Sequence, residues 1–207
     1  MENLAALYFL PMEAHTKAAA GISERKLRAR AARRARIISA AREIAEREGW
    51  PNVTVRRLAE EIGYSQPVLY SHFENRDAIL AAVAIEGFHE IGLTLEKARR
   101  RARRDPVESV ATAYLDFAAS SAALYEVMFS LGLTEPFDEP ATPAELRFAF
   151  GQLLELFKER SSKPEVVAEL FWASLHGIAE LTRTGRFPAR RQQERVRVLV
   201  ERFAMEG

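Results

Sequence analysis

The sequence predicts an all-α protein, with a small N-terminal three-helix domain and a larger C-terminal helical bundle. Apolar residues recur at helical spacing along most of the chain, and no strand is expected. Helix-capping residues precede several of these segments, among them Thr54, Asn75 and Asp105. Gly63 and Gly185 follow the last apolar residue of two segments, a position where glycine commonly ends a helix.

The composition is that of an ordinary soluble globular protein. The 207 residues are 48% hydrophobic and 29% charged, which excludes a disordered chain and a membrane-spanning one. The sequence has no cysteine, so disulfides, thiol catalysis and cysteine-based metal sites are excluded. A reducing cytoplasmic location fits this composition.

The net charge of +1 hides an asymmetry between the two halves. Residues 1–104 contain 19 Lys and Arg against 13 Asp and Glu, a charge of +6, whereas residues 105–207 contain 11 against 16, a charge of −5. Phosphate neutralisation supplies most of the sequence-independent affinity for DNA. The split therefore indicates a DNA-facing N-terminal half and a solvated C-terminal half.

Residues 1–24 are expected to be a flexible tail. An apolar run from Leu4 to Leu10 follows Glu2, where a secretory signal would carry positive charge, and seven residues are too few to span a bilayer. An upstream start codon, with the working start at Met12 or later, would explain the same stretch.

The segment from Arg25 to Arg36 holds seven basic residues and no acid. A solvated helix extension is the ordinary explanation for such a segment. Directly in front of a DNA-binding unit, it can instead follow phosphates or enter the neighbouring minor groove. A first amphipathic helix continues from Ile37 and ends near Gly49.

The stretch from Thr54 to Arg76 reads TVRRLAEEIGYSQPVLYSHFENR and predicts two short helices joined by a tight turn. Thr54 caps the first helix, whose apolar residues fall at i, i+3, i+4 and i+7 from Val55. Gly63 ends it, because a residue without Cβ tolerates left-handed backbone, and Ser65 is expected to cap the second helix through its side chain.

The second of these helices keeps most of its side chains pointing outward. Only Leu69 and Phe73 are placed to face a core. The outward face combines an amide, small apolar groups, a phenol and an imidazole. An amide can pair with adenine in the major groove, apolar atoms can meet a thymine methyl, and hydroxyl or imidazole groups can hold phosphates.

A long helix is expected from the Asn75 cap to about Arg104, with Asp77 favourably placed in its first turn. Such a helix, shared by two domains, connects them mechanically. The cluster KARRRARR at its close could be a second nucleic-acid patch, but we prefer a solvated helix terminus, where cations complement the helix dipole.

The second half divides at three cap signatures, which begin at Asp105, Thr142 and Ser162. The expected elements are helices over 106–118 and 122–129, a proline-containing loop over 132–143, and helices over 146–157, 163–184 and 189–205.

The last two of these helices are expected to form the dimer interface. The helix over 163–184 is apolar on two faces and must bury both, and the final helix has coiled-coil-like spacing. Pairing with symmetry mates would give an isologous four-helix contact. The expected interface residues are Val167, Leu170, Phe171, Ile178, Val196, Leu199, Val200 and Phe203.

The stretch GYSQPVLYSHFENRDAILAAV resembles the helix-turn-helix of the TetR family of bacterial transcriptional regulators. The resemblance extends without a gap from Arg36 to Val83. It implies a DNA-binding domain over 25–75, including the basic arm, and a ligand-binding and dimerisation domain over 76–207. Glu74 is a departure, because many relatives carry a lysine there.

The resemblance also implies roles for individual residues. Bases would be read by Arg56, Gln66, Pro67 and Val68. Phosphates would be held by Thr54, Ser65, Tyr70, Ser71, His72 and Arg76. A basic arm would add Arg28, Arg30, Arg33 and Arg34.

A second resemblance lies in Trp172-Ala-Ser-Leu-His176-Gly177, which is similar to the Trp, His and Gly signature of one C-terminal domain type in this family. Trp172 and His176 share a helix face at i and i+4. Plain core packing is the alternative to a role in a ligand cavity. The candidate cavity residues are Phe88, Tyr114, Phe117, Tyr125, Met128, Phe150, Trp172 and His176, whose character suggests a hydrophobic effector.

The sequence offers little to support an enzyme. It has no glycine-rich phosphate loop and no His-Glu pair at metal-binding spacing, and its four histidines lie in four different segments. We expect no catalysis, no metal and no cofactor.

The expected function is that of a homodimeric repressor that binds double-stranded operator DNA and is released by a small hydrophobic ligand. An activator of the same fold is one alternative. The other is a helical protein-interaction module without specific DNA binding. The operator sequence and the identity of the effector do not follow from the sequence.

Overall fold

The structure, a computed structural model, describes residues 12–131 and 142–204, and it describes side chains over 24–129 and 142–203. The expected tail over residues 1–11 and the expected loop over 132–141 lie outside the described residues. Helices make up the whole architecture of the described part, which contains no strand, so the all-α expectation is confirmed. The elements are α1 (Met12–Glu48), η1 (Trp50–Asn52), α2 (Val55–Ile62), α3 (Gln66–Tyr70), α4 (Arg76–Arg101), α5 (Pro106–Ser120), α6 (Ala122–Glu126), η2 (Val127–Leu131), α7 (Ala144–Leu154), α8 (Pro164–Arg183), η3 (Ala189–Arg191) and α9 (Gln192–Ala204).

Helix α1 is much longer than expected. We expected a flexible tail up to residue 24, whereas the helix begins at Met12 and runs for 37 residues. The cause lies in the sequence, because this alanine- and arginine-rich segment contains no proline between Met12 and Glu48. The basic segment is therefore helical. From Ile37 onward the same helix enters the core.

The two short helices form as expected, with one difference in capping. The Thr54 side chain accepts a hydrogen bond from the backbone N–H of Arg57, and Gly63 ends α2 with φ of 69°, which is left-handed backbone. Ser65 occupies the N-cap position of α3, but its side chain makes no capping bond. The expectation of a side-chain cap there was wrong. With Pro67 in the first turn, α3 has one backbone donor fewer to satisfy.

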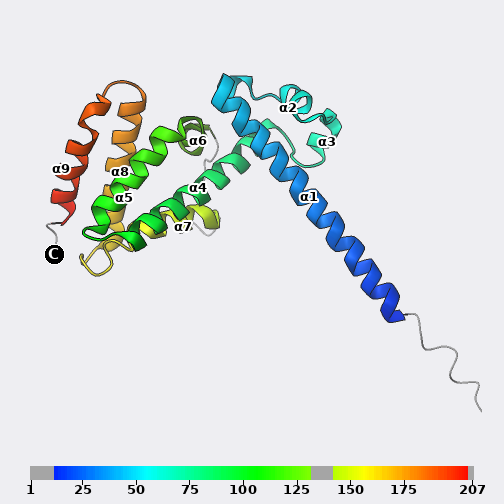
Figure 1. The fold of residues 1–207 in the computed structure, drawn as a ribbon, viewed down its shortest axis with the longest axis horizontal. Helices are drawn as coiled ribbons and strands as arrows, with labels where there is room; N and C mark the ends of the chain where they lie inside the picture. Colours follow the sequence, from blue (N-terminus) through cyan, green and yellow to red (C-terminus); the bar gives the residue numbers. More distant parts are fainter. Residues whose placement is uncertain (1–11, 132–141, 205–207) are drawn as a thin grey trace, which may run out of the picture.

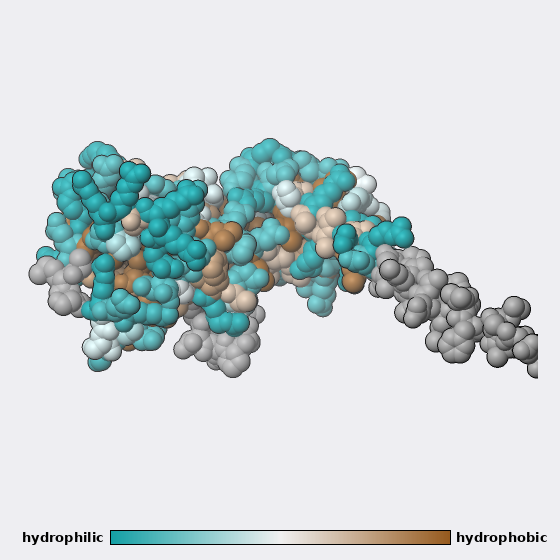
Figure 2. Space-filling view, turned by 60° about the horizontal axis from the view of Figure 1, so that its bottom comes forward, coloured by the Kyte–Doolittle hydropathy of each residue, from teal (hydrophilic) through white to brown (hydrophobic). Residues whose placement is uncertain are grey.

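Helix α4 is the central element of the molecule (Figure 1). It packs against α1, α5 and α7, and Arg42 of α1 bonds Glu90 of α4 at 2.5 Å. Of the described helices, α4 alone has the length and apolar composition to cross a membrane, and 56% of that apolar window is buried inside the structure. On the face shown in Figure 2, hydrophilic side chains cover most of both ends of the molecule.

In the C-terminal bundle, the helix cap expected from the sequence forms at α5, whereas those expected at α7 and α8 do not form. Asp105 caps α5 by accepting from the backbone N–H of Val107. Helix α7 instead begins after Pro143, which occupies the N-cap position without a side-chain cap, and the Thr142 side chain before it is buried. Helix α8 begins after Lys163, and neither that residue nor Ser162 makes a side-chain cap.

The contact between α4 and α7 depends on Gly92. A Cβ atom at this position would lie 2.5 Å from Cδ1 of Phe148 and 3.3 Å from the Cα of Ala149. These distances leave no room for a methyl group, because the neighbours are an aromatic ring and the backbone of the facing helix. Gly92 therefore sets how closely the two helices approach.

We expect Gly92→Ala to lower the free energy of unfolding by about 1 to 3 kcal/mol, because it overpacks the α4–α7 contact. Gly151→Ala in α7 is the matched control. No atom lies within 4 Å of its added Cβ, so the variant should gain up to about 1 kcal/mol from helix propensity. Urea denaturation measures both, and equal effects of the two substitutions would contradict the packing argument.

Candidate DNA-reading helices and ligand cavity

The outward face of α3 is open to solvent. Gln66, Pro67, Ser71 and Tyr70 are exposed, Tyr70 to 53%, and Val68 is half-buried. Leu69 and Phe73 lie in the core, as the spacing predicts. The structure thus brings an amide, a proline ring, a hydroxyl and a phenol together on one short helix at the end of the molecule opposite α9 (Figure 1).

Helix α2 presents one arginine outward and uses the other to hold itself in place. The side chain of Arg56 is 81% exposed and pairs with Glu60 at 3.0 Å. Arg57 bonds Glu48 of α1 at 2.9 Å and Glu61 at 2.7 Å. The Arg57 guanidinium lowers the pKa of the Glu48 carboxyl through this bond. Arg57 therefore ties α2 to the end of α1, and Arg56 is available for a ligand.

Arg34 and Arg76 both make contacts within the chain, and their expected phosphate contacts stay a prediction. Arg34 donates to the carbonyl oxygen of His72 at 3.0 Å and lies 4.0 Å over the ring of Phe73. Arg76 donates through Nε to the Val53 carbonyl at 2.6 Å and through Nη2 to the Trp50 carbonyl at 2.8 Å. The donors of both side chains satisfy backbone oxygens that end helices and turns, which positions α3 and η1.

Trp50 connects the reading helices to the bundle, a role that sequence reasoning missed. Its side chain is 2% exposed, and its indole N–H donates to the carbonyl oxygen of Ala123 in α6 at 2.8 Å. Arg76 holds the Trp50 backbone from the other side. One feature of the sequence could have indicated this role. Trp50 is a large side chain in the turn Gly49-Trp50-Pro51, where residues are usually exposed.

The surroundings of His72 favour its neutral form. Burial lowers the pKa of the imidazole, and the charges of Arg30, Arg33 and Arg34 lower it further. Its Nδ1 atom is buried and has no hydrogen-bond partner among the described residues. In contact with a phosphate, the imidazole N–H of His72 can supply a hydrogen bond.

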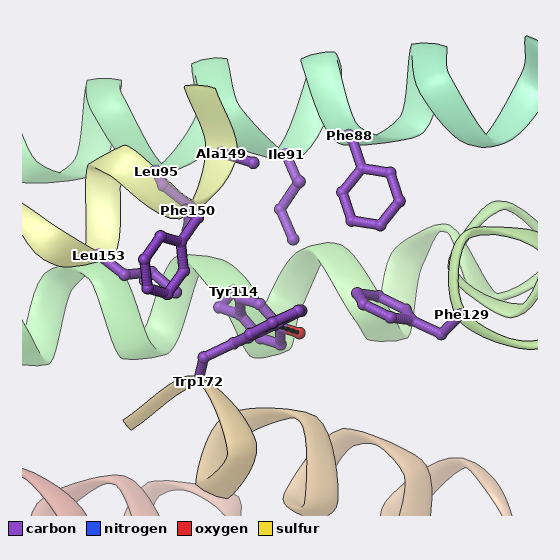
Figure 3. Close-up of a pocket in the computed structure, with 9 residues that line it drawn as sticks. All are labelled: Phe88, Ile91, Leu95, Tyr114, Phe129, Ala149, Phe150, Leu153 and Trp172. Carbon is purple, nitrogen blue, oxygen red and sulfur yellow. Dashed lines mark hydrogen bonds between the residues drawn. The ribbon is translucent and has the colours of Figure 1, made fainter. Parts of the chain in front are cut away.

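A cavity lies between α4, α5, η2, α7 and α8 (Figure 3). Four of the expected cavity residues line it, namely Phe88, Tyr114, Phe150 and Trp172. Five lining residues were missed: Ile91, Leu95, Phe129, Ala149 and Leu153. The volume open to the centre of a water molecule is about 20 Å³, which suits about one water. The cavity is apolar and small.

Two expected cavity residues, Tyr125 and His176, form a hydrogen-bonded wall beside the cavity rather than its lining. The Trp172 indole N–H donates to the Tyr114 hydroxyl at 3.1 Å. The two tyrosine hydroxyls are 2.9 Å apart, and the Tyr125 hydroxyl lies 2.8 Å from Nδ1 of His176. Phe117 and Met128 are buried in the core without lining the cavity.

The protonation state of His176 decides the direction of this hydrogen-bond chain. Burial lowers the pKa of His176, so at neutral pH its Nδ1 is free to accept. An indole can only donate, so Trp172 donates to the Tyr114 hydroxyl. Every hydroxyl proton is then bonded if Tyr114 donates to Tyr125 and Tyr125 donates to His176. Burial also raises the pKa of both tyrosines, which keeps the hydroxyls protonated.

The expected dimer residues divide between two faces. Val167, Phe171 and Val196 are buried within the protomer, and Phe171 packs against Phe157 and Phe203. For these three, the expectation of an interface role was wrong, because the apolar face they belong to covers the protomer's own core. Leu170 is 57% exposed. The remaining expected residues, Ile178, Leu199, Val200 and Phe203, are half-buried.

An open apolar face of α8 lies around Leu170. Val166 on the same helix is 49% exposed, and Val198 of α9 is 50% exposed. No atom lies within 4 Å of a Cβ built on Gly177. Gly177 therefore makes no close helix contact inside the protomer, and the surface beside it is free for another chain to approach.

Two family models match the chain. The model described as "Bacterial regulatory proteins, tetR family" matches residues 37–83, and "Tetracyclin repressor-like, C-terminal domain" matches residues 107–203. The chain is 30% identical over 153 residues to the Mycobacterium tuberculosis protein named "Uncharacterized HTH-type transcriptional regulator Rv0681", across 72% of this chain and 69% of that protein.

Solved structures share the fold. BioQ in complex with its double-stranded DNA operator has a TM-score of 0.62 at 21% identity, over 83% of this chain and 97% of BioQ. A TetR variant from Acinetobacter baumannii in complex with minocycline has a TM-score of 0.59 at 18% identity, over 81% of this chain and 92% of that protein.

We expect the hydrogen-bond chain to make stability depend on pH. The folded pKa of His176 lies below its ordinary value of 6.5, so the unfolded chain binds the proton more readily. The contribution of neutral His176 to the free energy of unfolding is therefore complete above about pH 6.5 and is lost as the pH falls below that value. His176→Asn keeps an acceptor for Tyr125 but does not titrate.

The variant should consequently lose less stability than the unmodified protein between about pH 7.5 and 5, while any contribution of His72 is common to both proteins. Urea denaturation at several pH values measures this. An unchanged pH dependence in His176→Asn would show that His176 does not titrate differently in the folded and unfolded states.

Proposed function

The chain belongs to the tetR family of bacterial transcriptional regulators, and we propose that it is a repressor whose operator is released when a small apolar molecule enters the α4–α8 cavity. The observation that carries this proposal is that one helix serves both sites. Phe88, Ile91 and Leu95 of α4 line the cavity, and Arg76 at the start of α4 holds the loop between α1 and α2.

We assign operator recognition to residues 25–75 and effector binding and dimerisation to residues 76–207. In α2 and α3, Arg56, Gln66, Pro67 and Val68 are placed to meet base edges. The groups assigned to phosphates are Thr54, Ser65, Tyr70, Ser71 and His72. Two copies would enter successive major grooves with half-site centres about 34 to 36 Å apart.

The open face of α8 supports dimerisation through a second copy of this chain. Leu170, Val166 and Val198 leave apolar surface uncovered in the protomer, and Gly177 allows close approach of a facing helix. A twofold axis through this face would pair α8 and α9 with their symmetry mates.

Release follows from the small size of the cavity. A space for about one water cannot hold a larger molecule unless the surrounding helices move apart. Gly92 fixes the α4–α7 distance, so an effector that separates the two helices displaces α4. Because Arg76 joins α4 to η1, this displacement reaches the reading helices. Couplings of this kind are typically about 1 to 3 kcal/mol.

The satisfied polar groups of the cavity wall favour an apolar effector. The Trp172 indole and the Tyr114 hydroxyl bond each other, and the Tyr114 hydroxyl continues the chain to Tyr125. A polar ligand would have to break these bonds, whereas an apolar one gains burial against nine mainly apolar residues. We assign the protein no catalytic step and place its action in the cytoplasm, where the operator is.

The proposal is tested by fluorescence anisotropy on an operator selected from a random-sequence duplex library, with scrambled DNA as the comparison. We expect discrimination of about a thousandfold or more at physiological salt. Gln66→Ala should lose about 1 to 3 kcal/mol on the selected operator and little on scrambled DNA. The matched control is Gln193→Ala in α9. Equal affinity of the unmodified protein for both DNAs would refute specific recognition.

We expect Ala149→Leu to imitate an occupied cavity. Ala149 is buried at the α4–α7 contact, and the added atoms should displace α4 and reduce operator affinity by about 5- to 150-fold, the usual range of coupling. Ala144→Leu on the exposed face of α7 is the control. Thermal denaturation establishes that both variants are folded. A folded Ala149→Leu protein with unchanged affinity would refute release through α4.

A further inference from the structure

Residues 24–36 of α1 project beyond the reading domain. Each of these residues is exposed, whereas Ile37 and Ile38 are buried. At 1.5 Å per residue, the exposed helical segment is about 20 Å long. Figure 1 shows α1 passing α3 and continuing away from α5, α8 and α9, so that its N-terminal part extends beyond the short helices.

The core-facing stripe of α1 becomes cationic where the helix leaves the domain. Ile37, Ala41 and Ile44 are buried, and helical spacing places Lys26, Arg30, Arg33 and Arg34 on the same side. The Arg34 contacts with His72 and Phe73 confirm that this side faces the end of α3.

The segment from Arg25 to Arg36 carries no negative charge of its own. Arg25 to Arg36 contains seven basic residues and no acid. Glu24 pairs with Arg28 at 2.5 Å, with both side chains largely exposed. A helix with this density of like charge is stabilised by an external polyanion, because neighbouring cations at i, i+3 and i+4 repel one another.

Because residues 24–36 are helical, the width of the helix limits how this segment can bind DNA. An α-helix with side chains is about 10 to 12 Å across, and the minor groove is about 6 Å wide. The expectation that a basic arm enters the minor groove therefore does not suit a helix. A rigid helix beside α3 can instead lie against phosphates, which need only exposed cations at the surface.

We propose that residues 24–36 of α1 form a rigid cationic helix that binds the phosphates flanking each half-site, outside the segment read by α3. This inference rests on the proposed operator binding and extends it to DNA that the reading helices do not touch. Lys26, Arg30 and Arg33 supply the contacts, and Arg34 anchors the helix to α3.

The test compares the full-length protein with the triple variant Lys26→Gln, Arg30→Gln and Arg33→Gln, in which glutamine preserves helix propensity. The control is Arg101→Gln, Arg103→Gln and Arg104→Gln, which removes the same charge from exposed positions at the C-terminal end of α4 and directly after it. Each protein is titrated by anisotropy, at several salt concentrations, against the selected operator with and without about ten flanking base pairs on each side.

We expect the unmodified protein and the control to bind the longer operator about tenfold or more tightly than the shorter one. The α1 variant should lose this preference while still discriminating operator from scrambled DNA. Its plot of log K against log salt on the longer DNA should become shallower by up to about 5, since six side chains of a dimer would each account for about 0.9.

Three results would overturn the inference: no effect of flanking length on the unmodified protein, equal losses by the α1 variant on both lengths, or equal losses by the control. A failure of operator recognition itself gives a different result. The unmodified protein would then bind operator and scrambled DNA equally. In that case, weaker binding of the α1 variant to scrambled duplex, with unchanged binding of the control variant, would support the cationic helix, and equal binding of both variants would refute it.

Discussion

The packing of α4 is the constraint on which the rest of the structure depends. The helix contributes Ile79 and Leu80 to the core beneath the reading helices, and Ile91 and Leu95 to the bundle and its cavity. A continuous helix cannot shift at one end without moving at the other. Gly92 brings the α7 backbone close to α4, and the contact between the two helices is closely packed, so that a shift of one helix would displace the other.

Hydrogen bonds to backbone oxygens complete the connection between the two halves. Arg76 holds two carbonyls of the loop after α1, and the Trp50 indole donates to α6. The carbonyl oxygens that accept these bonds lie outside regular helical hydrogen bonding or at helix ends, where buried polar groups would otherwise lack partners. Under the proposed release, the same residues that stabilise the domain junction would transmit movement across it. Helix α6 continues directly into η2, whose Phe129 lines the cavity.

Much of the fold could be predicted from local signals. Thr54, Gly63, Asn75 and Asp105 act where their chemistry predicts, because a cap or a left-handed turn depends on a few neighbouring residues. The caps expected at Thr142 and Ser162 failed for a different reason. Which residue takes the N-cap position depends on how the helix packs, and α7 places Pro143 there, with the Thr142 side chain buried before it.

The sequence by itself determined the helical class, the order of the elements, the reading helices and the cationic N-terminal segment, because periodicity, caps and charge are properties of neighbouring residues. Only the tertiary structure decided which arginines are free, which of Tyr114, Tyr125 and His176 line the cavity, and which face of α8 stays open. Each of these depends on partners far apart in the chain, such as Arg34 with His72 or Trp172 with Tyr114. One sequence does not reveal such pairings, because many helical residues have the same local pattern and only packing selects among them.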